Sequence, residues 1–196
     1  FLKATDADRP GLEGAKWCCS PPPRDEASQA AVWQGLADGT FQVLSSDHAP
    51  YRFDETGKLP TGDATALEDV AGGVPGLQVR LPLAFSEGVG KGRITLNEFV
   101  ALTATNHARM YGLAPRKGTI AVGSDADLVL WDPEQETRLA VETLHMRVDY
   151  NPYEGRLVRG GPAVVISRGE PIVERGQWKG RAGRGQFLKR QRFQTA

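Results

Sequence analysis

One short segment contains side chains that could carry out acid–base chemistry. The run from Val43 to Pro50 begins with apolar residues, continues with two serines and reaches Asp47 and His48 just before Ala49 and the proline. Apolar residues followed by a proline predict a buried strand that ends at the carboxylate. In α/β barrels, catalytic groups stand at the carboxyl ends of strands, where the loops form the mouth of the site. Asp47 is therefore a candidate general base, although this segment alone also fits a turn aspartate that caps its own backbone.

The bulk composition excludes several classes of protein. Over 196 residues, 24 Lys and Arg balance 24 Asp and Glu, and the sequence pI is about 7.0. No apolar run reaches the roughly 20 residues that would span a bilayer. We therefore expect no nucleic-acid partner and no membrane partner. The chain begins at Phe1 without a methionine or a signal peptide, so we expect that it starts in mid-course.

The two cysteines, Cys18 and Cys19, are adjacent. Their Cα atoms are separated by about 3.8 Å, which is below the usual range for a disulfide, and on a strand their side chains would point to opposite faces. We therefore expect reduced thiols and a cytoplasmic setting, and neither a catalytic pair nor a zinc-binding pair.

Local patterns predict alternating strands and helices in the first 115 residues. Thr95 and Glu98 form a capping box, and Gly39 follows a helical pattern, as is typical of a helix C-terminus. A stretch rich in Gly, Pro and Asp at 51–82 is expected to be a long excursion between elements. The expected elements are a strand at Lys16–Cys19, a helix at Asp25–Asp38, a strand at Phe41–Leu44, a helix from Leu96 and a short helix from Asn106 to Gly112.

The pattern changes after Pro115 and becomes rich in β-forming residues. The residues from Gly118 to Asp132 predict a hairpin-like turn that leads into a buried strand. Two further strands are expected at 163–166 and 171–173, divided by a turn at 168–170. These strands predict a second, all-β region.

The end of the chain is basic. From Gln177 onward there are six basic residues and no acidic one, and we interpret this part as a solvated or subunit-contacting arm. The sequence therefore predicts three regions, at 1–115, 116–176 and 177–196.

Several segments, taken in order, resemble the C-terminal half of the D-hydantoinase/dihydropyrimidinase family of cyclic amidohydrolases. The most specific part is the combination of Ser20-Pro21-Pro22 with Asn151-Pro152-Tyr153-Glu154-Gly155, whereas Gly123-Ser124-Asp125-Ala126-Asp127-Leu128 occurs in amidohydrolases generally. The resemblance extends over essentially all 196 positions. The other matching segments are Gly14-Ala15-Lys16, Ser46-Asp47-His48, Gly73-Val74-Pro75-Gly76, Arg80-Leu81-Pro82-Leu83, Thr105-Asn106, Pro115-Arg116-Lys117-Gly118-Thr119-Ile120 and Val148-Asp149-Tyr150.

The resemblance implies the C-terminal part of an α/β fold, a metal-dependent (β/α)8 barrel with a flanking β-sandwich. It also implies two divalent metal ions, usually zinc, bridged by a hydroxide and a carboxylated lysine. Members of this family open a cyclic diamide by hydrolysing one ring amide bond. The ions acidify water and polarise the scissile carbonyl, and a carboxylate moves the proton to the leaving nitrogen.

Three residues match functional positions of the family. Asp47 would be a metal ligand and the general base and acid, whereas His48 is interpreted as a structural residue or a neighbour of the site. Ser20 and Asn106 match positions whose backbone groups hold the amide edges of the ring. The alternatives are an ordinary turn before a proline for Ser20 and a helix N-cap for Asn106, which could serve in both ways.

The remaining metal ligands of the family are missing from this sequence. Relatives use a His-x-His pair, the carboxylated lysine and two further histidines, whereas this chain has only His48, His107 and His145. We expect His107 and His145 to be surface residues and the other ligands to lie upstream of Phe1. One carboxylate does not hold two zinc ions, because each takes three or four protein donors. The metal site of this chain is therefore expected to be incomplete.

These observations predict part of an enzyme that hydrolyses the cyclic amide bond of dihydropyrimidines or 5-substituted hydantoins, inactive without its missing half. The expected partners are the small cyclic diamide and further copies of the chain in a homodimer or homotetramer. The alternatives are another cyclic amidohydrolase such as an allantoinase, a non-catalytic dihydropyrimidinase-like interaction protein, and a stand-alone binding module. Asp47 favours the enzyme, because the non-catalytic relatives lose metal-site residues.

Overall fold

The computed structural model describes residues 1–192, and the chain divides into two compact units. The last four residues of the predicted basic arm, 193–196, lie outside the described residues. The expected division at 115 and 176 stays a prediction. The first unit contains Phe1–Gly35, Ser45–Leu83 and Thr137–Val158, and the second contains Leu36–Leu44, Ala84–Glu136 and the chain from Arg159 onward.

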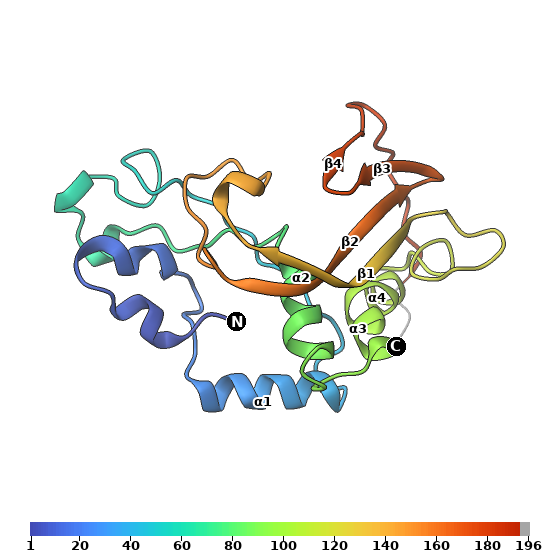
Figure 1. Ribbon diagram of the computed structural model, residues 1–196, viewed down its shortest axis with the longest axis horizontal. Coiled ribbons are helices and arrows are strands. Elements are labelled where there is room, and N and C mark those ends of the chain that lie inside the picture. The colour runs from blue at the N-terminus through green and yellow to red at the C-terminus, as the bar shows by residue number, and fades with distance from the viewer. Residues whose placement is uncertain (193–196) are drawn as a thin grey trace. The chain divides into compact units, whose positions relative to one another are not determined.

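Helix α1 spans Glu26–Ala37 and confirms the helix that the sequence predicts at Asp25–Asp38 (Figure 1). The backbone N–H of Ser28 donates to Oδ1 of Asp25 at 2.7 Å, so Asp25 caps the first turn. Gly39 follows the helix with a φ of 82°, which is the left-handed conformation that ends many helices.

Two strands predicted from the sequence are not formed. Gly11–Trp17 is a 3-10 helix, and Cys18 directly after it is extended. At the second predicted strand, Phe41–Leu44, the backbone N–H of Leu44 donates to the carbonyl of Leu102 at 2.9 Å. A strand needs a ladder of hydrogen bonds to a neighbouring strand. Among residues 1–192 neither segment has such a neighbour, and both predictions are wrong for this reason.

Most of the first unit is irregular backbone around two small apolar clusters. The long excursion predicted at 51–82 is confirmed, because it holds only short 3-10 turns at Gly62–Ala64 and Leu67–Asp69 before helix α2 at Arg80–Ala84. One cluster joins residues in and just before α2 to residues of 137–158. The other joins two residues of the excursion at 51–82 to Ala15. Their buried members are Val79, Leu83, Leu139 and Val158 in the first cluster, and Ala15, Leu59 and Val70 in the second.

A long helical stretch dominates the second unit. Helix α3 (Leu96–Val100), a π-helical turn (Ala101–Thr105) and helix α4 (Asn106–Met110) follow one another without interruption (Figure 1). The predicted capping box is present: the N–H of Glu98 donates to Thr95 Oγ1 at 3.2 Å, and the N–H of Thr95 donates to Glu98 Oε2 at 2.6 Å.

The strands form one four-stranded sheet in the order β1-β2-β3-β4. Strands β2 and β3 are antiparallel, as are β3 and β4, and each pair is joined by an Arg-Gly turn with positive φ at both residues. Two-residue turns of this kind match the twist of antiparallel strands. The turn predicted at 168–170 and the strands around it are therefore confirmed. The bounds are β1 Leu128–Arg138, β2 Leu157–Ser167, β3 Glu170–Glu174 and β4 Gln177–Trp178.

Strand β1 lies where the sequence predicts a buried strand, but none of its residues is buried. It stands at the edge of the sheet and has a strand neighbour on one side only. The prediction of burial is therefore wrong for this strand within the described part of the chain. The flanking β-sandwich stays a prediction, because residues 1–192 contain a single sheet.

Three aromatic rings form the centre of the second unit. Phe85, Phe99 and Trp131 have ring centroids 5.1 to 5.7 Å apart, and we call them the aromatic cluster. Gly160 of β2 lies directly against it, because a Cβ at this position would be 2.2 Å from a carbon of the Phe85 ring. With a φ of 91° as well, the position requires glycine.

The remaining elements are short. In the described residues, no helix combines the length and the apolar character needed to cross a membrane. The other bounds are 3-10 turns at Ala4–Asp8 and Val141–Thr143 and a π-helical turn at Phe85–Val89.

Candidate functional site

The first unit places the segments of Ser20 and Asp47 on either side of one glycine-rich strip, Ala71–Leu77. On one side the N–H of Gly73 donates to the carbonyl of Cys18 at 3.0 Å, and on the other the N–H of Ala49 donates to the carbonyl of Val74 at 3.2 Å. A Cβ on Gly73 would lie 2.6 Å from the Ala49 Cβ. The close approach therefore depends on glycine in the strip.

Two other glycines of the strip, Gly72 and Gly76, lie next to the segments of Ser20 and Asp47. A Cβ on Gly72 would lie 3.8 Å from the nitrogen of Ser20, and one on Gly76 would lie 4.0 Å from the carbonyl oxygen of Ser46, next to Asp47. The structure thus brings Ser20 and Asp47 to opposite edges of the same narrow piece of backbone.

Asp47 has an unusual backbone conformation and an open side chain. Its φ of 42° lies in the left-handed region, which few residues other than glycine adopt. The residue is exposed, and among residues 1–192 its carboxylate accepts no hydrogen bond, so it does not cap its own turn. A strained residue that offers a free carboxylate is typical of a functional position.

His48 is fixed by backbone groups of the strip. The N–H groups of Gly76 and Leu77 donate to its Nδ1 at 3.0 and 3.2 Å. Because these groups only donate, Nδ1 is the acceptor, and a neutral ring carries its proton on Nε2. This arrangement supports the structural interpretation of His48 and anchors the residue next to Asp47.

Ser20 is exposed and follows the two cysteines, which are both free. Its peptide bond to Pro21 is cis. Burial raises the pKa of the Cys19 thiol, and among the nearby charges Lys58 lowers it while the Asp47 carboxylate raises it. Cys19 is therefore held as a neutral thiol within electrostatic reach of Asp47.

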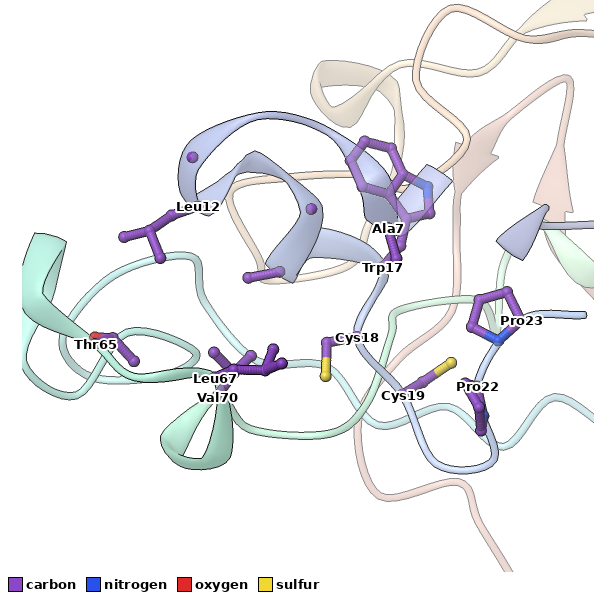
Figure 2. A pocket seen from close by; sticks show the side chains of 13 residues that line it. Ala7, Leu12, Trp17, Cys18, Cys19, Pro22, Pro23, Thr65, Leu67 and Val70 are labelled. Atoms are coloured by element: carbon purple, nitrogen blue, oxygen red, sulfur yellow. The ribbon is translucent and has the colours of Figure 1, made fainter. Parts of the chain in front are cut away.

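A cavity of about 290 Å³ opens beside this segment (Figure 2). Figure 2 shows the sulfur atoms of Cys18 and Cys19 pointing in different directions. Among residues 1–192 no Asp, Glu, His, Lys or Arg lines the cavity, and its ionisable groups are the thiols of Cys18 and Cys19. Its larger lining residues are Leu12, Trp17, Cys18, Cys19, Pro22, Pro23, Thr65, Leu67 and Val70.

Asn106 belongs to the second unit, and its nitrogen donors are both engaged. Its backbone N–H donates to the carbonyl of Ala101 across the π-helical turn, and its Nδ2 donates to the carbonyl of Gln42 at 2.8 Å. The backbone of Asn106 is helical, with φ −68° and ψ −36°. The expectation that it caps a new helix is wrong, because the π-helical turn carries the helix through this position. π-Helical turns often mark functional sites.

Two histidines predicted to lie on the surface have specific contacts. His107 is partly buried, its Nε2 lies 3.1 Å from the carbonyl oxygen of Leu44, and its ring stacks on Tyr111. A carbonyl only accepts, so Nε2 carries the proton. His145 is exposed, as predicted, and its Nδ1 lies 3.4 Å from Nε2 of Gln78. The surface prediction is wrong for His107, whose contact partner lies far away in the sequence.

The described residues do not provide a complete metal centre. Among residues 1–192 no group of three His, Cys, Asp or Glu side chains is placed to hold a metal ion. Zinc takes three or four protein donors, and Asp47 alone does not meet this requirement.

Lys58 is the residue near the site that sequence reasoning missed. It is fully buried and donates from Nζ to two backbone carbonyls, those of Cys18 and Ala71. In the sequence, Lys58 lies in the stretch rich in Gly, Pro and Asp at 51–82. A lysine in such a stretch is predicted to be exposed.

The chain is similar to D-hydantoinases and to a dihydropyrimidinase over nearly its whole length. D-hydantoinase from Geobacillus stearothermophilus is 46% identical over 186 residues, which are 95% of this chain and 39% of that protein. D-hydantoinase from Rhizobium radiobacter is 41% identical over 98% of this chain and 41% of its own length. The crystal structure of dihydropyrimidinase from Brevibacillus agri NCHU1002 matches with a TM-score of 0.94 and 44% identity, over 100% of this chain and 42% of that one.

The chain thus spans about 40% of the length of these relatives, and its whole length is similar to them. Their names confirm the resemblance to D-hydantoinases and dihydropyrimidinases on which the sequence interpretation rests. Residues 12–172 match the amidohydrolase family over most of the chain. The chain belongs to the amidohydrolase family.

Proposed function

We propose that this chain supplies the ring-binding and proton-transferring part of a hydrolase that opens cyclic amides, either dihydropyrimidines or 5-substituted hydantoins. The observation that carries the proposal is the placement of Ser20 and Asp47 on opposite edges of the glycine-rich strip. The names of the relatives, D-hydantoinase and dihydropyrimidinase, support hydantoins and dihydropyrimidines as the substrate class.

Ser20 and Asn106 would hold the amide edges of the ring through their backbone groups. Ser20 is exposed at the edge of the strip, which leaves room for a planar ring against its backbone. Both nitrogens of Asn106 are engaged, so an oxygen of this residue would accept a hydrogen bond from a ring N–H. A cyclic diamide carries N–H donors at its edge, which suit an oxygen acceptor on Asn106.

Asp47 would transfer the proton. Its carboxylate is exposed and accepts no hydrogen bond within residues 1–192, so it is free to take a proton from the attacking water. It would then pass that proton to the ring nitrogen as the amide bond breaks. The carboxylate is regenerated in the second transfer, so the ring gains one water in total.

The amidohydrolase family suggests a divalent metal centre, for which we propose zinc. Bound there, metal ions would acidify the water and polarise the scissile carbonyl. Asp47 would be one ligand, and the described residues do not complete the donor set. We therefore propose that the other donors come from outside these 196 residues and that the chain alone does not hydrolyse the ring. We also propose a homodimer or homotetramer for the active protein.

The proposal is tested by comparing Asp47→Asn with His48→Asn in the full-length hydrolase. Asp47→Asn keeps the size and removes the proton-accepting group, so turnover of hydantoin or dihydrouracil should fall by at least about 10³-fold. Zinc content, measured in parallel, should be largely retained. In His48→Asn the Asn oxygen still accepts from the N–H groups of the strip, so this control should lose far less. Equally mild effects would reject the catalytic role of Asp47.

A further inference from the structure

Lys58 is 0% exposed, although lysine is almost never fully buried without a partner. Its Nζ donates to the carbonyl oxygens of Cys18 and Ala71, each at 2.8 Å. Within the described part of the chain, Lys58 pairs with no carboxylate. Its ammonium group therefore serves two backbone carbonyls of the first unit and no acidic side chain.

These two carbonyls belong to different segments. The carbonyl of Cys18 accepts a second hydrogen bond, from the N–H of Gly73 at 3.0 Å. Burial lowers the pKa of Lys58, because the charged form loses its water. A neutral amine would still carry two hydrogens, one for each carbonyl. The link between the two segments therefore does not require the charge.

The turn that carries Lys58 is fixed by its own hydrogen bonds. The N–H of Lys58 donates to the carbonyl of Arg52 at 2.8 Å, and the N–H of Thr56 donates to Asp54 Oδ1 at 2.9 Å. A Cβ on Gly57 would lie 2.2 Å from the carbonyl oxygen of Arg52, so the turn requires glycine there. The backbone thus delivers the lysine side chain to a defined point in the first unit.

The turn that carries Lys58 is held by a segment of the first unit that comes later in the chain, around Asp149. The N–H of Phe53 donates to Asp149 Oδ1 at 2.8 Å, and Arg52 lies near the same carboxylate. Asp149, which lies in one of the segments that resemble the family, therefore supports the turn from which Lys58 extends.

We propose that Lys58 is a positioning residue that sets the place of Ser20 relative to Asp47. Cys18 is two residues before Ser20, and Ala71 begins the strip whose other edge holds His48 next to Asp47. Without Nζ the Ser20 segment loses one of its two links to the strip, whereas the bonds to His48 keep Asp47 in place. The inference rests on the proposed function, in which Ser20 holds the ring and Asp47 moves the proton. Lys58 therefore controls ring binding more than proton transfer.

The kinetic test replaces Lys58 in the full-length hydrolase. Lys58→Met keeps an unbranched side chain, shorter by one atom, and removes the donor, so the KM for hydantoin should rise by about 10- to 100-fold. The kcat of the folded variant should stay within about 3-fold. Lys58→Arg keeps donors at this position and should have a KM closer to that of the unmodified protein. If the Met variant does not fold, Lys58→Gln, whose amide NH2 still donates from a shorter side chain, replaces it and should show an intermediate KM.

The matched control is Lys3→Met, which removes an exposed lysine paired with Glu26 at 2.6 Å. Its KM should stay within about 2-fold. An unchanged KM in a folded Lys58→Met protein, a loss confined to kcat, or an Arg variant as impaired as the Met variant would overturn the proposal.

A second test does not require hydrolysis, because Cys19 lies beside Ser20 and reports on the same segment. Lys58 lowers the pKa of the Cys19 thiol, so removing the cation without any movement would slow labelling by a thiol reagent. If the segment is released, labelling of Cys19 in the 196-residue chain should instead be at least about 5-fold faster in Lys58→Met, and unchanged in Lys3→Met.

Slower or unchanged labelling would show that Lys58 does not hold this segment. A full-length protein that does not hydrolyse hydantoin would reject the proposed function, whereas the labelling result would still decide the role of Lys58. The two failures are therefore distinguishable.

Discussion

In the first unit, buried and partly buried polar side chains hold irregular backbone in place, whereas in the second unit the aromatic cluster packs the helical stretch against the sheet. Nζ of Lys58, Nδ1 of His48 and Nε1 of Trp17 each bond to backbone groups from distant parts of the first unit. The second unit has regular hydrogen bonding within its helices and hairpins, a few side-chain bonds such as that from Asn106 to Gln42, and the three packed rings of the aromatic cluster.

The difference predicts two kinds of sensitivity. When a polar side chain that donates a hydrogen bond to a buried carbonyl is replaced by an apolar one of similar size, that hydrogen bond is lost. The carbonyl then stays buried without a donor, which costs free energy of folding. Packing between rings tolerates polar changes at the surface but responds to lost volume. The first unit should therefore be sensitive to loss of single donors, and the second to cavities.

The largest effect is expected from a cavity in the aromatic cluster. Phe99 is 7% exposed and contacts both other rings, so Phe99→Ala should lower the free energy of unfolding of the second unit by about 3–5 kcal/mol. Urea unfolding, with hydrogen exchange to assign the change to the second unit, measures it. Phe41→Ala, at a ring that is 45% exposed, should cost less than about 1 kcal/mol. Similar losses in both variants would contradict the role of the cluster.

A smaller loss is expected from one donor in the first unit. The indole Nε1 of Trp17 donates to the carbonyl of Pro152 at 3.1 Å in buried surroundings. Trp17→Phe keeps an aromatic ring and removes this donor, so it should destabilise the first unit by about 1–3 kcal/mol. Trp178→Phe, at an exposed position, should change stability by no more than about 0.5 kcal/mol. If hydrogen exchange of the first unit is unchanged in Trp17→Phe, polar anchoring is not what holds this unit.

The two units should also respond differently to alkaline pH. Burial raises the pKa of Tyr153, in the first unit, to about 12 from 10.0. Between these values the folded state keeps a proton that the unfolded state loses, so stability falls as the pH rises from 10 to 12, by up to about 1.4 kcal/mol per pH unit. Tyr153→Phe should reduce this slope in pH-dependent urea unfolding. Tyr111→Phe, at an exposed residue of the second unit, should leave it as it is.

The smallest effect concerns the capping box at the start of α3. Thr95→Ala removes the hydroxyl that accepts from the Glu98 N–H and should cost about 1 kcal/mol in the second unit. Thr95→Ser keeps the hydroxyl and should retain most of the stability in the same unfolding measurement. An equal loss in the Ser variant would mean that the methyl group, not the cap, matters at this position.

Features that depend on neighbours in the sequence could be predicted. The capping box of Thr95 and Glu98 spans three residues, and the turn at Arg168 and Gly169 is set by two residues with positive φ. Helix α1 follows from a local apolar pattern and a glycine stop. Each of these predictions rests on residues that are close together in the sequence.

Features that depend on distant contacts could not be predicted. Trp17 and Pro152 are 135 residues apart, and Lys58 is 40 residues from Cys18. No local pattern distinguishes a buried lysine from an exposed one before the carbonyls that surround it are known. For the same reason the predicted strands at 16–19 and 41–44 were wrong, because a strand depends on a neighbour that the local pattern does not contain.

The candidate site divides in the same way. Ser20, Asp47 and Asn106 were chosen because they match motifs of a family, and the structure adds the geometry around each one. The left-handed φ of Asp47 and the π-helical turn before Asn106 are conformations that residue types alone do not predict. The contact from His107 to Leu44 was missed because it joins segments 63 residues apart.

The π-helical turn at Ala101–Thr105 gives the helical stretch one place where its length can change. A π-helical turn contains one residue more than an α-helical turn would need. Deleting one residue within it would let the helix close as a regular α-helix, and the residues after the deletion would stay close to the faces that they now occupy. Asn106 would then remain on the face on which its side chain meets Gln42. Deleting a residue within α3 would instead rotate every later residue of the stretch by about 100° around the axis, so natural variation in chain length should be found in the π-helical turn.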